Sequence, residues 1–100
     1  TGLPPLASPI AHTPQLYFPY PNPASDRLDF DYFLPKSSGA ILILTDPIGR
    51  IVWKAQVDAG STSGLQHATI QIDGFESGRY QLSLQADGVL RTKSVTIIRP

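Results

Sequence analysis

Residues 40–57 read AILILTDPIGRIVWKAQV, two apolar segments joined by a turn, and this stretch decides the fold. In the turn, Asp46 can accept main-chain hydrogen bonds, Pro47 presets its own φ angle, and Gly49 can take the left-handed conformation. This combination is typical of a type I turn with a G1 bulge, which joins two antiparallel strands. Residues 40–44 are apolar on both faces, which favours a central strand of a sheet.

Alternation of apolar and polar residues recurs along the rest of the chain and indicates further strands with one buried and one wet face. The pattern covers Leu28–Tyr32, Ile51–Val57, Ala68–Asp73 and Tyr80–Ala86, and shorter strands are expected at Leu16–Phe18 and Val95–Ile98. Asp87-Gly88 is typical of a type I′ hairpin turn, and Gly60–Gly64 and Phe75–Gly78 are expected to be connections. Trp53 and Tyr80 are expected to anchor the core. About seven short strands indicate an all-β fold, an immunoglobulin-like antiparallel β-sandwich.

Length and composition narrow the classes of function. The chain has 100 residues, room for one domain, and it carries 8 basic and 8 acidic residues and no cysteine. This charge balance gives no field that would draw nucleic acid or an anionic membrane, and disulfides and thiolate metal sites are excluded. The longest apolar run, residues 40–44, is too short to insert into a bilayer. Thr1 starts no signal peptide, so we expect a longer precursor.

The first 15 residues differ in composition from the rest of the chain. Pro4, Pro5, Pro9 and Pro14 are separated mostly by small residues, a pattern that favours an extended polyproline-type segment over a packed element. We therefore predict a proline-rich linker over residues 1–15 and one folded domain over residues 16–100.

Catalysis and cofactor binding are not indicated. His12 lies in the predicted linker and His67 begins the strand that continues to Asp73, so no metal-ligand spacing is present. Asp29 and Asp31 share the wet face of one strand, which suits a solvated surface or a weak cation contact more than acid-base chemistry. We expect no catalytic residue, no cofactor and no metal.

Three motif blocks and a closing hairpin give the chain a family resemblance. The blocks are Pro21-Asn22-Pro23-Ala24-Ser25-Asp26, then Leu44 followed by Asp46, Gly49, Arg50 and Val52, then Ser77-Gly78 with Tyr80, Leu82 and Leu84, and Gly88 to Lys93 leads into the last strand. In this order the set resembles the C-terminal sorting domain of proteins exported by the type IX secretion system, over about Leu16 to Pro100. Two departures are Pro47 in a turn of variable sequence and the ending Arg99-Pro100, where many members end on a basic residue.

The resemblance implies a sorting signal without chemistry of its own. Similar domains direct their parent protein from the periplasm through the outer membrane, to the cell surface or the medium. The implied partners are an outer-membrane shuttle protein, the translocon, and a sortase that cuts before the domain and attaches the cargo to anionic lipopolysaccharide. On this basis cleavage is expected within residues 1–15, where extended chain is open to a protease.

The candidate recognition residues also have structural interpretations. They are Pro21, Asn22, Pro23, Asp26, Asp46, Gly49, Arg50, Gly78, Tyr80, Gly88 and Lys93. The prolines restrict the entry to a strand, and the aspartates and glycines are first of all turn formers. Arg50, Arg91 and Lys93 are better candidates for a surface that faces a partner, although charges at strand ends also protect edges.

Two alternatives share the sandwich fold. One is an accessory module that binds glycan or spaces a catalytic domain. A coplanar row of exposed aromatic side chains would favour glycan binding, and the pattern does not assign Tyr17, Phe18, Tyr20 and Phe33 to inward or outward positions. The other is a docking module that stays uncleaved on a component of the secretion machinery. An exposed edge strand can also pair with a partner or with a second copy of the chain.

Overall fold

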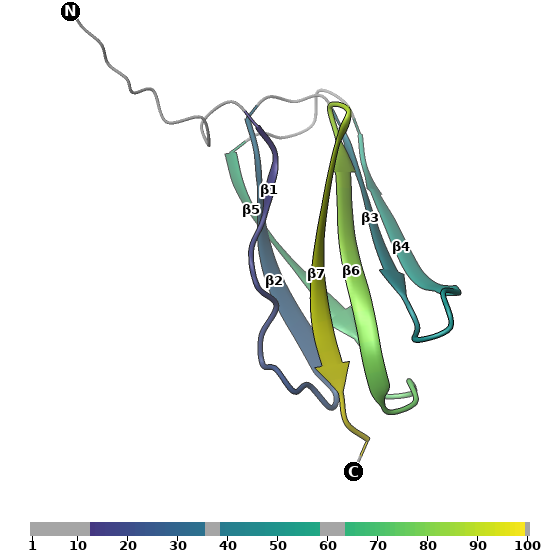
Figure 1. Cartoon of the computed structure of the whole chain (residues 1–100). Coiled ribbons are helices and arrows are strands. Elements are labelled where there is room, and N and C mark those ends of the chain that lie inside the picture. Colours follow the sequence, from purple (N-terminus) through teal and green to yellow (C-terminus); the bar gives the residue numbers. More distant parts are fainter. Residues whose placement is uncertain (1–12, 36–38, 59–63, 100) are drawn as a thin grey trace, which may run out of the picture.

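Seven β-strands in two antiparallel sheets form the domain (Figure 1). The computed structural model describes residues 13–35, 39–58 and 64–99, and most of the predicted linker lies outside these ranges. The strands are β1 (Gln15–Leu16), β2 (Arg27–Leu34), β3 (Ala40–Thr45), β4 (Ile51–Val57), β5 (Gly64–Gln71), β6 (Gly78–Ala86) and β7 (Val89–Ile97). No helix occurs among the described residues. In particular, that part of the chain contains no helix long and apolar enough to cross a membrane.

The strand order confirms the predicted sandwich. One sheet has the order β1-β2-β5 and the other the order β4-β3-β6-β7, with every pair of neighbours antiparallel. The chain passes from one sheet to the other between β2 and β3, between β4 and β5, and between β5 and β6. Two antiparallel sheets of this size with crossing connections are the immunoglobulin-like arrangement. β3 lies between β4 and β6, as its two apolar faces predicted.

The core fills the space between the two sheets. Inward positions of β2, β3 and β6 alternate with more exposed ones, and these inward side chains include Leu28, Phe30, Leu34, Leu42, Leu44, Tyr80, Leu82 and Leu84. Phe30 is fully buried and meets the half-buried Trp53 edge to face, with ring centroids 6.4 Å apart. Tyr80 is 3% exposed. The prediction of a core anchor is therefore confirmed for Tyr80, whereas Trp53 packs against the core and is only half-buried.

Both predicted hairpin turns are present. Gly49 has a φ of +92°, and its N–H donates a 2.9 Å hydrogen bond to the carbonyl oxygen of Asp46. The pairing of β3 with β4 shifts register between Leu44 and Thr45, as expected for a bulge beside this turn. Asp87 and Gly88 have φ angles of 52° and 75°, the two positive values that a type I′ turn requires.

A segment of irregular chain, residues 17–26, joins β1 to β2 and also pairs with the other sheet; it is here called the crossing segment. Near its start, Tyr20 exchanges two 2.8 Å main-chain hydrogen bonds with Asp29 of β2. Further on, Ala24 forms a parallel bridge with Ile97 of β7, in the other sheet. The Tyr20-Pro21 and Asn22-Pro23 peptide bonds are cis. The crossing segment thus ties β2 to the outer edge of β7.

The main differences from the predicted strand boundaries concern β1, β5 and β7. β1 covers Gln15–Leu16 instead of Leu16–Phe18, because after the hydrogen bond from the Tyr17 N–H to the carbonyl oxygen of Asp31 the pairing with β2 is interrupted, and it resumes only at the isolated Tyr20–Asp29 bridge. β7 begins at Val89 and not at Val95, since its pairing with β6 starts directly after the Asp87-Gly88 turn. His67 lies in the middle of β5, opposite Asp31, and does not begin a strand. Of the predicted connection Gly60–Gly64, only Gly64 is among the described residues.

Candidate docking surface at one end of the sandwich

The motif blocks, far apart in the sequence, meet at one end of the sandwich. We call this the motif end, made of residues 20–26, 46–50 and 74–80 (Figure 1, bottom). The pairing of Ile97 shows the convergence, because Ile97 lies opposite Gly78 on one side and bridges Ala24 on the other. Residues 20–26 and 74–80 are thereby joined through the end of β7. Residues 46–50 adjoin residues 74–80, since Pro47 lies against Gly78.

The β3–β4 turn is held by a single carboxylate. Asp46 Oδ1 accepts hydrogen bonds from the main-chain N–H groups of Ile48 (3.1 Å) and Arg50 (2.8 Å), and Oδ2 accepts one from Arg50 Nε (2.8 Å). Burial of the carboxyl opposes ionisation, but the hydrogen bonds from Arg50 outweigh it and lower the pKa of Asp46. The carboxylate therefore orients the Arg50 guanidinium as well as closing the turn.

The motif end has two walls: the β3–β4 turn is the first, and the connection between β5 and β6, held by Tyr80, is the second. Its hydroxyl donates a 2.8 Å hydrogen bond to the carbonyl oxygen of Glu76, and its ring stacks on Phe75 with centroids 5.9 Å apart. The Phe75 N–H in turn donates to the carbonyl oxygen of Ile72. The connection between β5 and β6 is thereby fixed against the core in three places.

Gly78 is required by its neighbour and not by its backbone angle. A Cβ atom placed on Gly78 would lie 2.7 Å from Cγ of Pro47, closer than carbon atoms pack. We predict that Gly78→Ala lowers the free energy of unfolding by roughly 1–3 kcal/mol through overpacking. Gly74→Ala is the matched control, because a Cβ atom placed on Gly74 would have no atom within 4 Å. Urea unfolding of the two variants measures the difference, and equal midpoints would contradict the steric explanation.

A pocket of about 310 Å³ opens between the two walls. It is lined by Asp46, Pro47, Ile48, Arg50, Val52, Gly74, Phe75, Glu76, Ser77 and Tyr80. Four of the predicted recognition residues, Asp46, Gly49, Arg50 and Tyr80, line this pocket or shape the turn beside it. Sequence reasoning missed Ile48, although a large aliphatic side chain at the tip of a turn is a signal for a contact surface.

The proline block forms the neighbouring part of the motif end. Asn22 Oδ1 accepts a 3.1 Å hydrogen bond from the Thr96 N–H, and Ala24 exchanges main-chain hydrogen bonds with Thr96 and Ile98. Pro21, Asn22, Pro23 and Asp26 are exposed. Pro21 and Asp26 border a hollow of about 420 Å³ together with Arg27 and Gln71. The proline block therefore both caps the edge of β7 and presents a free surface.

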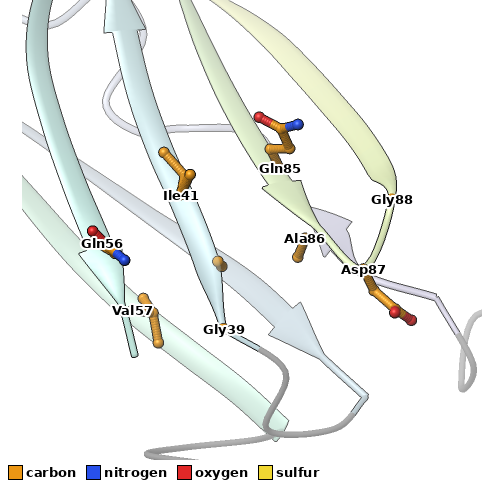
Figure 2. Close-up of a pocket in the computed structure, with 9 residues that line it drawn as sticks. Gly39, Ile41, Gln56, Val57, Gln85, Ala86, Asp87 and Gly88 are labelled. Atoms are coloured by element: carbon orange, nitrogen blue, oxygen red, sulfur yellow. The ribbon is translucent and has the colours of Figure 1, made fainter. Parts of the chain in front are cut away.

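Two predicted recognition residues lie away from the motif end. Gly88 is at the opposite end, beside a hollow of about 350 Å³ (Figure 2) that is lined by Gly39, Ala40, Ile41, Gln56, Val57, Gln85, Ala86, Asp87 and Gly88. Asp87 is the only charged residue among the described residues of this lining. Lys93 is in the middle of β7, and its ammonium group lies 4.2 Å from the ring centre of Phe18. The structure thus gathers nine of the eleven candidates, Pro21, Asn22, Pro23, Asp26, Asp46, Gly49, Arg50, Gly78 and Tyr80, at one end.

The aromatic side chains left unassigned by the sequence lie in and beside the crossing segment. Tyr17, Phe18 and Tyr20 are exposed by 42%, 71% and 45%. Phe33, in β2, is half-buried. The ammonium group of Lys93 lies over the Phe18 ring, a cation–π contact between the crossing segment and the edge strand β7. Of these four rings, Phe18 contacts β7, whereas Tyr20 lies beside His67 of β5, with ring centroids 6.3 Å apart.

A polar cluster lies on the outer face of β2 and β5. Asp29, expected on a wet face, is only 7% exposed, because the crossing segment pairs over it and the Thr69 hydroxyl donates to its Oδ1 at 2.6 Å. This hydrogen bond is the main reason that the pKa of Asp29 is lowered, with the Arg27 charge adding to it.

Among the described residues no group of three or more His, Asp or Glu side chains has the arrangement of a metal site.

His67 gives the domain a predicted dependence on pH. Its Nδ1 donates to Asp31 Oδ1 at 2.8 Å, and this hydrogen bond raises the pKa of His67 above about 6.5, its ordinary value. Protonated His67 thus stabilises the fold below about pH 6.5, and this contribution is lost as the pH rises through the raised pKa of the folded state. We predict that urea unfolding shows a small fall in stability over this window.

The variant His67→Gln is the control for the pH prediction. It removes the titrating group but leaves His12 and both carboxylates in place, so its stability should not fall above about pH 6.5. The lowered pKa values of Asp29 and Asp46 act at the other flank, where stability is lost as the pH falls through them. An identical fall in parent and variant at neutral pH would show that another group is responsible.

Comparison with known proteins identifies the family. A search among curated proteins finds no significant match. The family model of the secretion system C-terminal sorting domain matches residues 19–98, which include the three motif blocks and all strands from β2 to β7. This confirms the resemblance to type IX sorting domains that the motif order indicated. The chain therefore belongs to the family of secretion system C-terminal sorting domains.

Proposed function

We propose that this domain is the export signal of a larger protein and directs it from the periplasm across the outer membrane through the type IX secretion system. The family match over residues 19–98 is the observation that carries this proposal. Its motif blocks meet at one end of the sandwich, which gives a secretion component one continuous surface to recognise. The parent protein is then displayed on the cell surface or released.

The proposed partners are an outer-membrane shuttle protein, the translocon and a sortase. The domain itself carries no active site in this proposal. We propose that these partners recognise an assembled surface and not a reactive group. The polar side chains Asp29 and His67 support this view, because their hydrogen bonds stabilise the fold. Attachment of the cargo to anionic lipopolysaccharide after cleavage belongs to the same proposal.

The proposed cleavage lies N-terminal to the folded domain. Pro14 is fully buried and its carbonyl oxygen accepts a 3.0 Å hydrogen bond from Arg91 Nε, and Gln15 begins β1. A protease needs an extended backbone that is not hydrogen-bonded in a sheet, so the peptide bonds at Pro14 and Gln15 are poor cleavage sites. Within the predicted linker of residues 1–15, we therefore place the cut before Thr13.

The test is a reporter with a secretory signal, followed by residues 1–100, in a cell with a type IX system and in a translocon mutant. Surface display in the competent cell alone, with a loss of mass equal to that of the domain, is the expected result. Display without the loss of mass would support instead the alternative of a retained docking module. A folded reporter that stays periplasmic in both strains would overturn the proposal.

A further inference from the structure

The walls of the pocket at the motif end are held by contacts within the domain itself. One wall is the β3–β4 turn, closed by three hydrogen bonds to Asp46, and the other is the Phe75–Tyr80 stack, fixed by the Tyr80 hydroxyl. Pro47 and Gly78 pack the walls together. A preformed site loses little conformational entropy on binding, so a small contact area can still give a measurable affinity.

The interior of the pocket is apolar. Val52 and Phe75 are half-buried and Pro47 lies beside them, while Ile48 at the rim is 75% exposed. A volume of about 310 Å³ is at the lower end for ligand sites, enough for one or two side chains of a peptide. An aliphatic side chain that enters here would bury its own surface and that of Ile48.

The charges at the rim favour an acidic group next to that side chain. Arg50 uses Nε to bind Asp46, and 74% of its side chain is exposed, so its terminal amino groups can pair with a second carboxylate. The acidic residue of the opposite wall that lines the pocket, Glu76, already pairs with Arg99 Nη1 at 3.1 Å. Repulsion of an incoming carboxylate by Glu76 is thereby reduced.

We propose that this pocket binds a short peptide segment of a secretion component, in which an aliphatic side chain is followed by a carboxylate. The aliphatic group enters between Val52 and Phe75, and the carboxylate pairs with Arg50. This assignment rests on the proposed function and specifies where the machinery holds the domain. It also explains why the turn block at Asp46 and the block at Tyr80 occur together in one sequence, since each builds one wall of the same site.

The first experiment measures binding in solution. Capped peptides with leucine followed by glutamate, and with leucine followed by glutamine, are titrated into the isotope-labelled chain of residues 1–100. We expect the glutamate peptide to shift the amide signals of Ile48, Val52 and Phe75 and to bind about tenfold more tightly than the glutamine peptide, as a charge-assisted contact to Arg50 implies. Equal affinities, or shifts confined to other parts of the domain, would overturn the proposal.

The second experiment uses the export reporter with matched variants. Ile48→Thr combined with Arg50→Gln alters the pocket, and Ile51→Thr combined with Arg79→Gln removes an exposed isoleucine and an exposed arginine outside its lining. We expect about a tenfold loss of surface display for the first pair and none for the second. Normal display of both pairs would overturn the pocket assignment while leaving the sorting function intact, whereas failure of the parent reporter would instead refute the sorting function.

Folding and self-association are checked with the same variants. Equal urea midpoints for both pairs show that the pocket variant is folded, and the single variant Ile48→Thr serves if the loss of the Arg50 contact unfolds the turn. Sedimentation of the parent chain tests a second copy as the occupant. A dimer that the pocket variant alone abolishes would overturn the peptide proposal.

Discussion

Truncation of the chain after Ser94 is expected to unfold the domain and to abolish export. The lost segment contains Val95 and Ile97, which are 1% and 0% exposed, and each such side chain contributes roughly 1.5–3 kcal/mol of burial. It also contains the partners of Gly78 and Ala24, so both neighbours of the β7 end lose their pairing. Together these losses approach the whole stability of a small domain, about 5–15 kcal/mol.

A shorter truncation separates this effect from a direct role of the last residues. Removal of Arg99 and Pro100 takes away the main-chain contact to Ser77 and the ion pair with Glu76, and leaves β7 complete. We expect this variant to unfold cooperatively near the parent midpoint. Circular dichroism with thermal unfolding measures both variants, and a cooperative transition for residues 1–94 at the parent temperature would contradict the argument.

Phe30→Ala should have the largest effect among the single changes. The side chain is fully buried between the sheets, against Tyr32 and Trp53, with ring centroids 6.0 and 6.4 Å away. Loss of a core phenylalanine costs roughly 3–5 kcal/mol, because the surroundings collapse only partly into the cavity. Urea unfolding should show a much lower midpoint with a similar slope.

Phe18→Ala is the matched control for this prediction. Phe18 is 71% exposed and its contact is with Lys93 on the edge of β7. An exposed cation–π contact contributes about 0.5–1 kcal/mol, so the loss should be several times smaller than at Phe30. Comparable losses at the two positions would mean that the crossing segment stabilises the domain more than its contacts indicate.

Local chemistry explains why much of the fold could be predicted. Turns such as Asp46 to Gly49 and Asp87-Gly88 depend on neighbouring residues only, and the sequence predicts both together with their positive φ angles. The alternation of apolar and polar residues in β2 and β6 is likewise a local pattern, and it predicts which side chains of each strand are buried. Strand ends were less accurate, since pairing partners and not propensity decide where β1 stops and β7 starts.

The long-range arrangement could not be predicted in the same way. The motif blocks looked like separate turn formers, and only the pairing of Ile97 with Gly78 and its bridge to Ala24 show that they meet. Asp29 is buried for a similar reason, because Tyr20 pairs over it from the crossing segment. Ile48 lines a pocket only because Phe75, in the connection between β5 and β6, lies across from it. The sequence around Ile48 contains no information on this long-range neighbour.

The attachment of β1 to the end opposite the motif end has a mechanical consequence. Gln15 pairs with Phe33, near the last residue of β2, whereas the motif end adjoins Arg27, the first residue of that strand. Eight strand residues separate the two ends by about 25 Å at 3.3 Å per residue. Under the proposed function, a passenger joined before Thr13 is therefore attached at the end of the domain remote from the surface that the secretion machinery binds. This separation would let the same surface serve passengers of different size.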